Sequence, residues 1–185
     1  MKKMFAFLLM MVSVAIWAQI PNIEIPNAKG DFKPTNEVNL EKLDIKVKIA
    51  GNISTTVMTM VFRSNSNRIL EGRLTFPLPE GVSVSGYALD INGKLRNAVP
   101  VEKEKAKEVF ESIDRRRVDP GLLVKVEGNN FRTRIYPIMP NSTRTVQITY
   151  HQELKKIGGN LQYFLPMAFE KAIPEFNLKT SVFEN

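Results

Sequence analysis

Residues 143–154 read TRTVQITYHQEL and hold the most regular alternation of apolar and polar side chains in the chain. Successive side chains of a β-strand point to opposite faces, so a period of two predicts a strand with one buried face. The apolar face carries Val146, Ile148 and Tyr150, and the polar face carries Thr145, Gln147, Thr149 and His151. This segment therefore predicts a strand that covers a core on one side.

Similar apolar patterns recur along the chain of 185 residues, separated by Gly, Pro and Asn. Further strands are expected at Leu43–Ile49, 57–62, Leu70–Phe76, Val82–Ile91, Leu122–Glu127, Phe131–Ile138, Leu161–Met167 and Phe176–Phe183. Residues 57–62 are apolar on both sides and predict a strand buried on both faces. Asn92-Gly93 predicts a two-residue hairpin, because both central positions of that turn need positive φ. The pattern predicts a mainly β fold, a two-layer antiparallel β-sandwich.

One short helix is expected within this sandwich, at about residues 101–114. Ala106, Val109, Phe110 and Ile113 recur at the spacing i, i+3, i+4 and i+7, which places them on one helical face. Asp119-Pro120-Gly121 then predicts a chain break after the helix.

The first 18 residues have the layout of a secretory signal peptide. Lys2 and Lys3 precede the apolar run 4–17, and Ala18 offers a small residue for cleavage. A bilayer span needs about 20 apolar residues, so this run is too short to cross one. We expect a cleaved signal peptide (1–18), a protein that is not integral to a membrane, and a secreted, periplasmic or cell-envelope location.

Composition excludes several kinds of chemistry. The chain has no cysteine, which removes thiolate zinc sites and cysteine nucleophiles. Its one histidine, His151, falls on a polar strand face, and the acidic residues fall mostly on the expected helix or in turns. We therefore expect no catalytic residues, no metal, no cofactor and no enzymatic activity.

The sharpest charge cluster is Arg115, Arg116 and Arg117. The formal net charge is +7, and loss of Lys2 and Lys3 with the signal peptide lowers it to +5. A solvated helix end explains three arginines, and the alternatives are a candidate anion-binding site for an acidic glycan and a protease-sensitive exposed loop. Nucleic-acid binding requires aromatic side chains interleaved with the cations. None flank this run, so no nucleic-acid partner is expected.

Several segments, taken in order, resemble the VIT (vault protein inter-alpha-trypsin) domain. They are Glu71–Gly81 with its Phe-Pro-Leu-Pro phrase, Ile91–Lys94, Glu102–Ala106, Pro120–Leu123, Asn130–Ile138 and Arg144–Tyr150. The residues that carry the resemblance are Phe76, Pro77, Leu78, Pro79, Gly81, Gly93, Pro120, Gly121, Phe131, Ile135, Pro137 and Tyr150. These residue types end strands, form turns or fill a core, so the resemblance supplies no active-site residue.

The resemblance also carries expectations about neighbouring domains. VIT domains usually precede a von Willebrand factor type A domain that holds a metal through Asp-x-Ser-x-Ser, a sequence this chain lacks. The chain thus resembles a bacterial-type exported member without that domain, or the N-terminal fragment of a larger VIT and von Willebrand type A adhesion protein.

These observations divide the chain and suggest a role. We expect a lead-in segment (19–40), a VIT domain (41–155), and C-terminal strands (156–185) that continue the sandwich or lead to a next domain. The leading hypothesis is an exported, non-catalytic interaction or scaffold module of the cell envelope, with a protein as its partner. An unpaired edge strand near residues 176–183 is a candidate way to recruit another chain.

Overall fold

The computed structural model describes residues 21–79, 81–91, 93–98, 123–126, 129–165, 167, 169 and 171–183. Outside them lie the expected signal peptide, the expected helix (about 101–114), Arg115, Arg116, Arg117, Pro120 and Gly121. The described residues form strands β1 (Asn22–Pro26), β2 (Phe32–Pro34), β3 (Val38–Ala50), β4 (Ile53–Ser64), β5 (Leu70–Pro77), β6 (Ser83–Ile91), β7 (Lys94–Ala98), β8 (Leu123–Lys125), β9 (Asn130–Ile138), β10 (Thr143–Glu153), β11 (Lys155–Ile157), β12 (Asn160–Gln162) and β13 (Glu175–Phe183).

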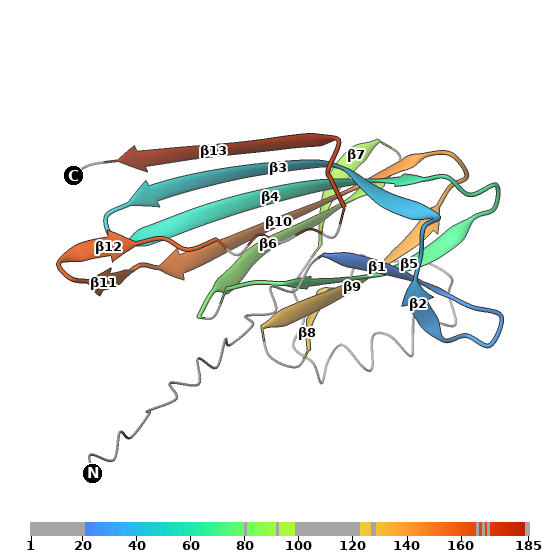
Figure 1. Ribbon diagram of the computed structural model, residues 1–185, viewed down its shortest axis with the longest axis horizontal. Coiled ribbons are helices and arrows are strands. Elements are labelled where there is room, and N and C mark those ends of the chain that lie inside the picture. Colours follow the sequence, from blue (N-terminus) through green and yellow to red (C-terminus); the bar gives the residue numbers. More distant parts are fainter. Residues whose placement is uncertain are drawn as a thin grey trace, which may run out of the picture.

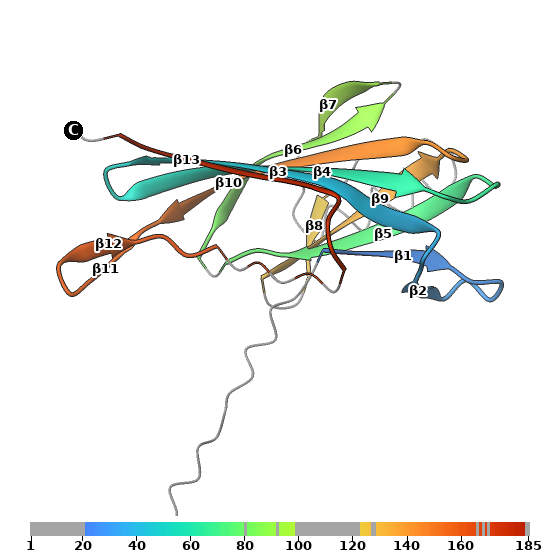
Figure 2. The same ribbon diagram turned by 45° about the horizontal axis from the view of Figure 1, so that its top comes forward.

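The strands form two facing sheets and one small hairpin. The larger sheet has six strands in the order β13-β3-β4-β10-β6-β7, and the smaller has five in the order β2-β1-β5-β9-β8. The smaller sheet lies under one half of the larger one, whose other half extends toward the β11–β12 hairpin (Figures 1 and 2). The predicted mainly β, two-layer sandwich is confirmed.

The core lies between the two sheets and follows the period of two. In β3, Leu43, Ile45 and Val47 are at most 1% exposed, and Lys46 and Lys48, which alternate with Ile45 and Val47, are exposed. The facing strand β5 contributes Leu74 and Phe76, which are fully buried. Burying each such apolar side chain contributes about 1.5–3 kcal/mol. The predicted inward side chains of β10 (Val146, Ile148 and Tyr150) are also fully buried.

Two tight turns join neighbouring strands of the larger sheet at glycines. Gly51 lies between β3 and β4 with a φ of 58°, and Gly93 lies between β6 and β7 with a φ of 76°. A side chain with a Cβ rarely adopts this conformation, so glycine is the favoured residue at both positions. The hairpin predicted at Asn92-Gly93 is confirmed, because Ile91 pairs with Lys94.

Three strand predictions need correction. Val57 and Val61 of β4 are only half-buried, because nothing in the described residues covers the outer face of the larger sheet. The strand predicted at Leu161–Met167 ends at Gln162, where the chain leaves the β11–β12 hairpin. The sandwich is not wholly antiparallel either, because β13 runs parallel to β3.

The lead-in and C-terminal segments both contribute to the sandwich. In the former, β1 pairs with β5 and buries Ile23 and Ile25 in the core. In the latter, the chain after β12 crosses beneath the larger sheet before it rises into β13 (Figures 1 and 2). Tyr163 packs against the core on this path, and its hydroxyl lies 2.8 Å from the buried Thr56 hydroxyl.

Candidate interaction surface

β13 is an edge strand with one free side. All nine of its residues pair in parallel with β3, from Glu175 beside Lys42 to Phe183 beside Ala50. Its other side has no neighbouring strand among the described residues (Figure 1). The backbone N–H and C=O groups on that side are available to a further strand, which makes an edge of this kind a template for pairing.

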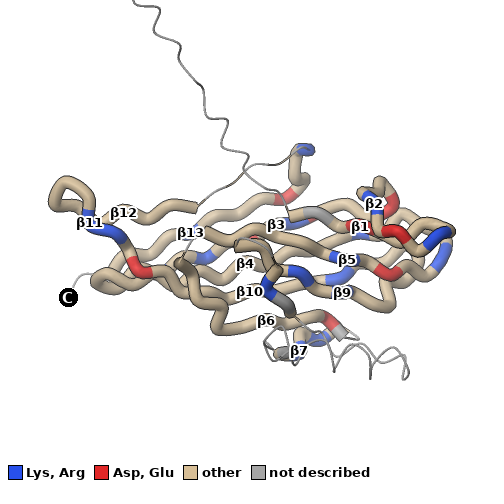
Figure 3. Tube along the Cα trace, turned by 90° about the horizontal axis from the view of Figure 1, so that it is seen from below, with Lys and Arg blue, Asp and Glu red and all other residues tan. Residues whose placement is uncertain are grey.

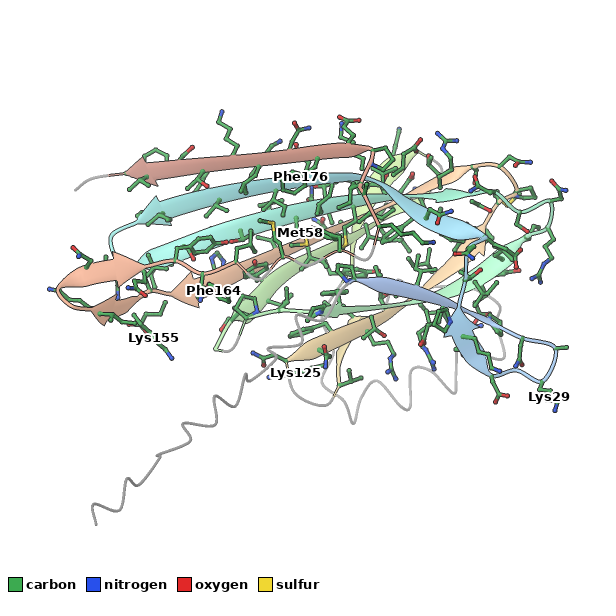
Figure 4. The ribbon with its side chains drawn as sticks, in the orientation of Figure 1. Lys29, Met58, Lys125, Lys155, Phe164 and Phe176 are labelled. Atoms are coloured by element: carbon green, nitrogen blue, oxygen red, sulfur yellow. The ribbon has the colours of Figure 1, made fainter. Side chains whose placement is uncertain are left out.

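The side chains of β13 make this edge apolar on one face. Aligned residues of a parallel pair share a face, so Phe176 and Leu178 lie on the core side with Leu43 and Ile45. The smaller sheet does not extend this far, and Phe176 is 44% and Leu178 46% exposed. Figure 4 shows the Phe176 side chain at the start of β13. The apolar face of the sheet therefore continues to its open edge.

Further exposed apolar side chains precede β13. They are Ile157 at 55%, Leu161 at 46%, Phe164 at 67% and Met167 at 41% exposed. Most of the large exposed apolar side chains in the described residues thus fall between Ile157 and Phe183.

Charged groups line the opposite face of β13. The carboxylate of Glu175 accepts a hydrogen bond from the ammonium group of Lys42, and this bond raises the pKa of Lys42. Lys179 stands directly beside Lys46, whose ammonium lies 3.6 Å from a carboxylate oxygen of Asp44. No acidic side chain in the described part of the chain pairs with Lys179.

The residues that carry the family resemblance form the core and turns rather than a site. Phe76 and Phe131 are buried and stack with ring centroids 6.0 Å apart. Leu78, Ile135 and Tyr150 are buried, Pro77 ends β5, and Gly81 has a φ of 75°. Pro79 and Pro137 lie just after β5 and within β9, where they interrupt ladder pairing.

Four of the described arginines are held in ion pairs. Arg73 pairs with Glu24 at 2.7 Å and stacks over the ring of Phe32, and Arg134 pairs with Glu71 at 2.6 Å. Arg63 and Arg68 are paired with glutamates in the same way. Basic and acidic positions are interspersed along the chain (Figure 3). Each of these four guanidinium groups therefore already has a carboxylate partner.

The side chains of the kinds that serve in catalysis are not gathered at one place in the described residues. His151 lies on the outer face of β10, and its Nδ1 is 2.9 Å from the Thr55 hydroxyl. No cluster of histidine and acidic side chains in the described residues could hold a metal ion. The residues described also include no helix with the length and apolarity to cross a membrane.

One open depression of about 550 Å³ lies beside β1 and β2. Its lining includes Asn27, Lys33 and the ion pair of Glu37 with Arg68. A hydrogen bond from the Ser66 side chain lowers the pKa of Glu37, and the hydrogen bond and positive charge of Arg68 lower it further. The carboxylate therefore stays ionised and is paired with the guanidinium group of Arg68. The carboxylate and guanidinium that face this depression therefore satisfy each other rather than a ligand.

The family model of the vault protein inter-alpha-trypsin domain matches residues 40–150, more than half of the chain. The chain belongs to the VIT domain family. It is 23% identical over 151 residues to human inter-alpha-trypsin inhibitor heavy chain H3, and 20% identical over 152 residues to human heavy chain H4. Each match covers 80% of this chain but only 17% and 16% of the relative.

A bovine heavy chain H3 is 21% identical and covers 94% of this chain and 20% of the relative. This VIT protein therefore spans a fifth or less of the length of the relatives described here. A solved structure of a nutrient-binding-protein candidate from Legionella pneumophila has a TM-score of 0.37 and 11% identity, and covers 73% of this chain and 44% of that one.

Proposed function

We propose that this VIT protein is an exported, non-catalytic module that binds another protein through the free edge of β13. The observation that carries the proposal is a nine-residue edge strand with an exposed apolar face. Edges of this kind bind by strand addition, in which backbone hydrogen bonds supply affinity and alternate side chains supply specificity.

The edge of β13 lacks the features that usually protect a sheet edge. Its sequence, EFNLKTSVF, contains no proline or glycine and a single lysine, Lys179. Its pairing with β3 proceeds without a bulge over all nine positions. Natural edges that avoid association are short, bulged, covered or rich in inward-facing charge. The core-facing side chains Phe176 and Leu178 are apolar instead.

The opposite edge of the same sheet behaves differently. β7 has five residues, KLRNA, of which Lys94 and Arg96 are cationic. Like charges at this density discourage a second strand. The two edges of one sheet thus differ in length and charge, and this contrast supports β13 as the binding edge.

Export and the absence of catalysis complete the proposal. The apolar run 4–17 after Lys2 and Lys3 supports export through a cleaved signal peptide. The isolated position of His151, bonded to Thr55 on the outer face, supports a role in binding rather than hydrolysis.

Site-specific photo-crosslinking in the source cell tests binding at β13. A photoreactive amino acid would replace Leu178, which is 46% exposed, and in a control chain Leu95 of β7, which is 45% exposed. The proposal predicts a covalent adduct of defined mass from position 178 and none from position 95. Adducts from neither position, or equal adducts from both, would overturn it.

Export has its own test. The protein recovered from the envelope or medium is expected to begin at Gln19. Recovery of the chain only from the cytoplasm with residues 1–18 intact would contradict export.

A further inference from the structure

We infer that the partner at β13 is a second copy of this chain, and that two β13 strands pair antiparallel about a two-fold axis centred on Asn177. This inference rests on the proposed use of the β13 edge. The side chains of β13 identify the partner.

Residues 175–179 are complementary to themselves when reversed. They read Glu-Phe-Asn-Leu-Lys. In antiparallel pairing about Asn177, Glu175 of one copy lies opposite Lys179 of the other, and Phe176 lies opposite Leu178. Asn177 lies opposite its own copy, where two side-chain amides can each donate and accept a hydrogen bond. Each facing pair within residues 175–179 is therefore matched in charge, in apolarity or in hydrogen bonding.

The two-fold axis resolves an imbalance within the single chain. Lys179 stands beside Lys46 in the ladder, and like charges at facing positions are destabilising. Across the axis, Glu175 of the second copy would lie on the free side of Lys179. Glu175 also bonds Lys42, so one row of the joined sheet would read Lys46, Lys179, and then Glu175 and Lys42 of the second copy, with the carboxylate between two ammonium groups.

Pairing about this axis also extends the apolar face. Directly opposed residues of antiparallel strands lie on the same face of a sheet. Phe176 and Leu178 are 44% and 46% exposed. In the dimer, Phe176 of each copy would pack against Leu178 of the other on the core side. The result is one continuous sheet of twelve strands, from six in each copy.

The two neighbouring registers match less well. A centre at Lys179 places Lys179 opposite itself and Glu175 opposite Phe183, and so sets like charges against each other. A centre at Leu178 sets Glu175 opposite Ser181 and Phe176 opposite Thr180, which leaves both the carboxylate and the ring unmatched. At the other edge of the sheet, β7 strands centred on Arg96 would bring two arginines together.

Charge reversal tests this pairing. Glu175→Lys and Lys179→Glu would each be made in the whole chain, with Lys94→Glu on β7 as the control. Sedimentation velocity over a range of concentrations should show a wild-type dimer. Each single variant should weaken that dimer by about tenfold or more, because both cross-axis pairs become like-charged. The Lys94→Glu control should dimerise as wild type does.

Mixing the two variants separates pairing from misfolding. The Glu175→Lys chain presents a lysine at both charged positions, and the Lys179→Glu chain presents a glutamate at both. In a mixed dimer both cross-axis pairs therefore join opposite charges, so an equimolar mixture should regain the wild-type dimer. A merely structural defect would not be repaired by mixing. A wild-type chain that stays monomeric at every concentration, or a mixture that stays monomeric, would overturn the inference.

Cysteine crosslinking fixes the register. The chain has no natural cysteine, so one substitution gives one thiol. Asn177→Cys should oxidise to a disulfide-linked dimer, whereas Lys179→Cys should not, because only residue 177 meets its own copy. Faster linkage at 179 than at 177 would overturn the register.

The outcomes distinguish this inference from the proposed function. Photo-adducts at position 178 that hold two copies of this chain support both. Photo-adducts at that position with a different protein, beside a monomeric wild-type chain, overturn the inference and leave the proposed function standing. Absence of any adduct at position 178 overturns the proposed function.

Discussion

Gly72→Ala probes how tightly the smaller sheet packs. Gly72 lies within β5, buried between β1 and β9. A Cβ added there would lie 2.9 Å from the Cδ1 atom of Ile138, which is fully buried and has little room to move. Ile23 is the next contact, at 3.9 Å. The substitution therefore overpacks one defined point of the core.

The expected magnitude combines two opposing effects. Overpacking a dense core costs about 1–3 kcal/mol. Replacing glycine with alanine at a permitted backbone conformation returns about 0.4–1 kcal/mol through the unfolded chain. We expect Gly72→Ala to destabilise the wild type by about 0.5–2 kcal/mol. Ile138→Val removes Cδ1, so in that background Gly72→Ala should instead stabilise by about 0.4–1 kcal/mol.

Urea unfolding of the four chains in this double-mutant cycle measures the effect. The sign of the Gly72→Ala change should reverse between the two backgrounds, giving a coupling of about 1–3 kcal/mol. Gly86→Ala is the matched control, because its Cβ would meet Thr149 at 3.3 Å on the outer face, away from Ile138. Equal effects of Gly72→Ala in both backgrounds would refute the packing described here.

Three further predictions concern the core. Phe76→Ala should cost about 3–5 kcal/mol in urea unfolding, because Phe76 is fully buried and stacks on Phe131; a loss below about 1 kcal/mol would contradict this packing. Tyr87→Phe should cost about 1–2 kcal/mol in the same assay, because its hydroxyl lies 2.7 Å from Thr133 of the other sheet; an unchanged midpoint would argue against that bond. Burial raises the pKa of the Tyr150 hydroxyl above 10.0, so above about pH 10 unfolding releases a proton and the free energy of unfolding should fall by about 1.4 kcal/mol per pH unit. Tyr150→Phe should remove this slope in thermal unfolding. An equal slope in both chains would refute burial of Tyr150 as its cause.

Local patterns predicted much of the fold. The alternation in β10 identified its buried face, and Asn92-Gly93 identified a hairpin, because both depend on residues close in sequence. Phe76 and Phe131 were identified as core residues from the segments that resemble the VIT domain, and the structure shows their rings stacked. The first two features follow from backbone geometry and side-chain period alone.

Long-range pairing was not accessible in this way. The parallel alignment of β13 with β3 joins residues more than 130 positions apart, and no local period encodes a partner strand. The half-exposed Val57 and Val61 were misassigned for a related reason, since apolar side chains do not reveal which face of a sheet remains uncovered.

The candidate surface was foreseen only in outline. An unpaired edge strand near residues 176–183 was expected as a candidate way to recruit another chain. Its self-complementarity emerged once the alignment with β3 showed that Lys179 stands beside Lys46 and that Phe176 and Leu178 face the core side. Which charges lack a partner is a property of the folded sheet.

Hydrogen exchange of the β13 backbone amides tests the central claim most directly. Exchange would be followed by mass spectrometry at low and high protein concentration, with peptides covering 175–183 and, as the control edge, 94–98. The account predicts that exchange in 175–183 slows by about tenfold or more at high concentration while exchange in 94–98 does not change. Equal exchange of 175–183 at both concentrations would contradict binding of a second copy at this edge.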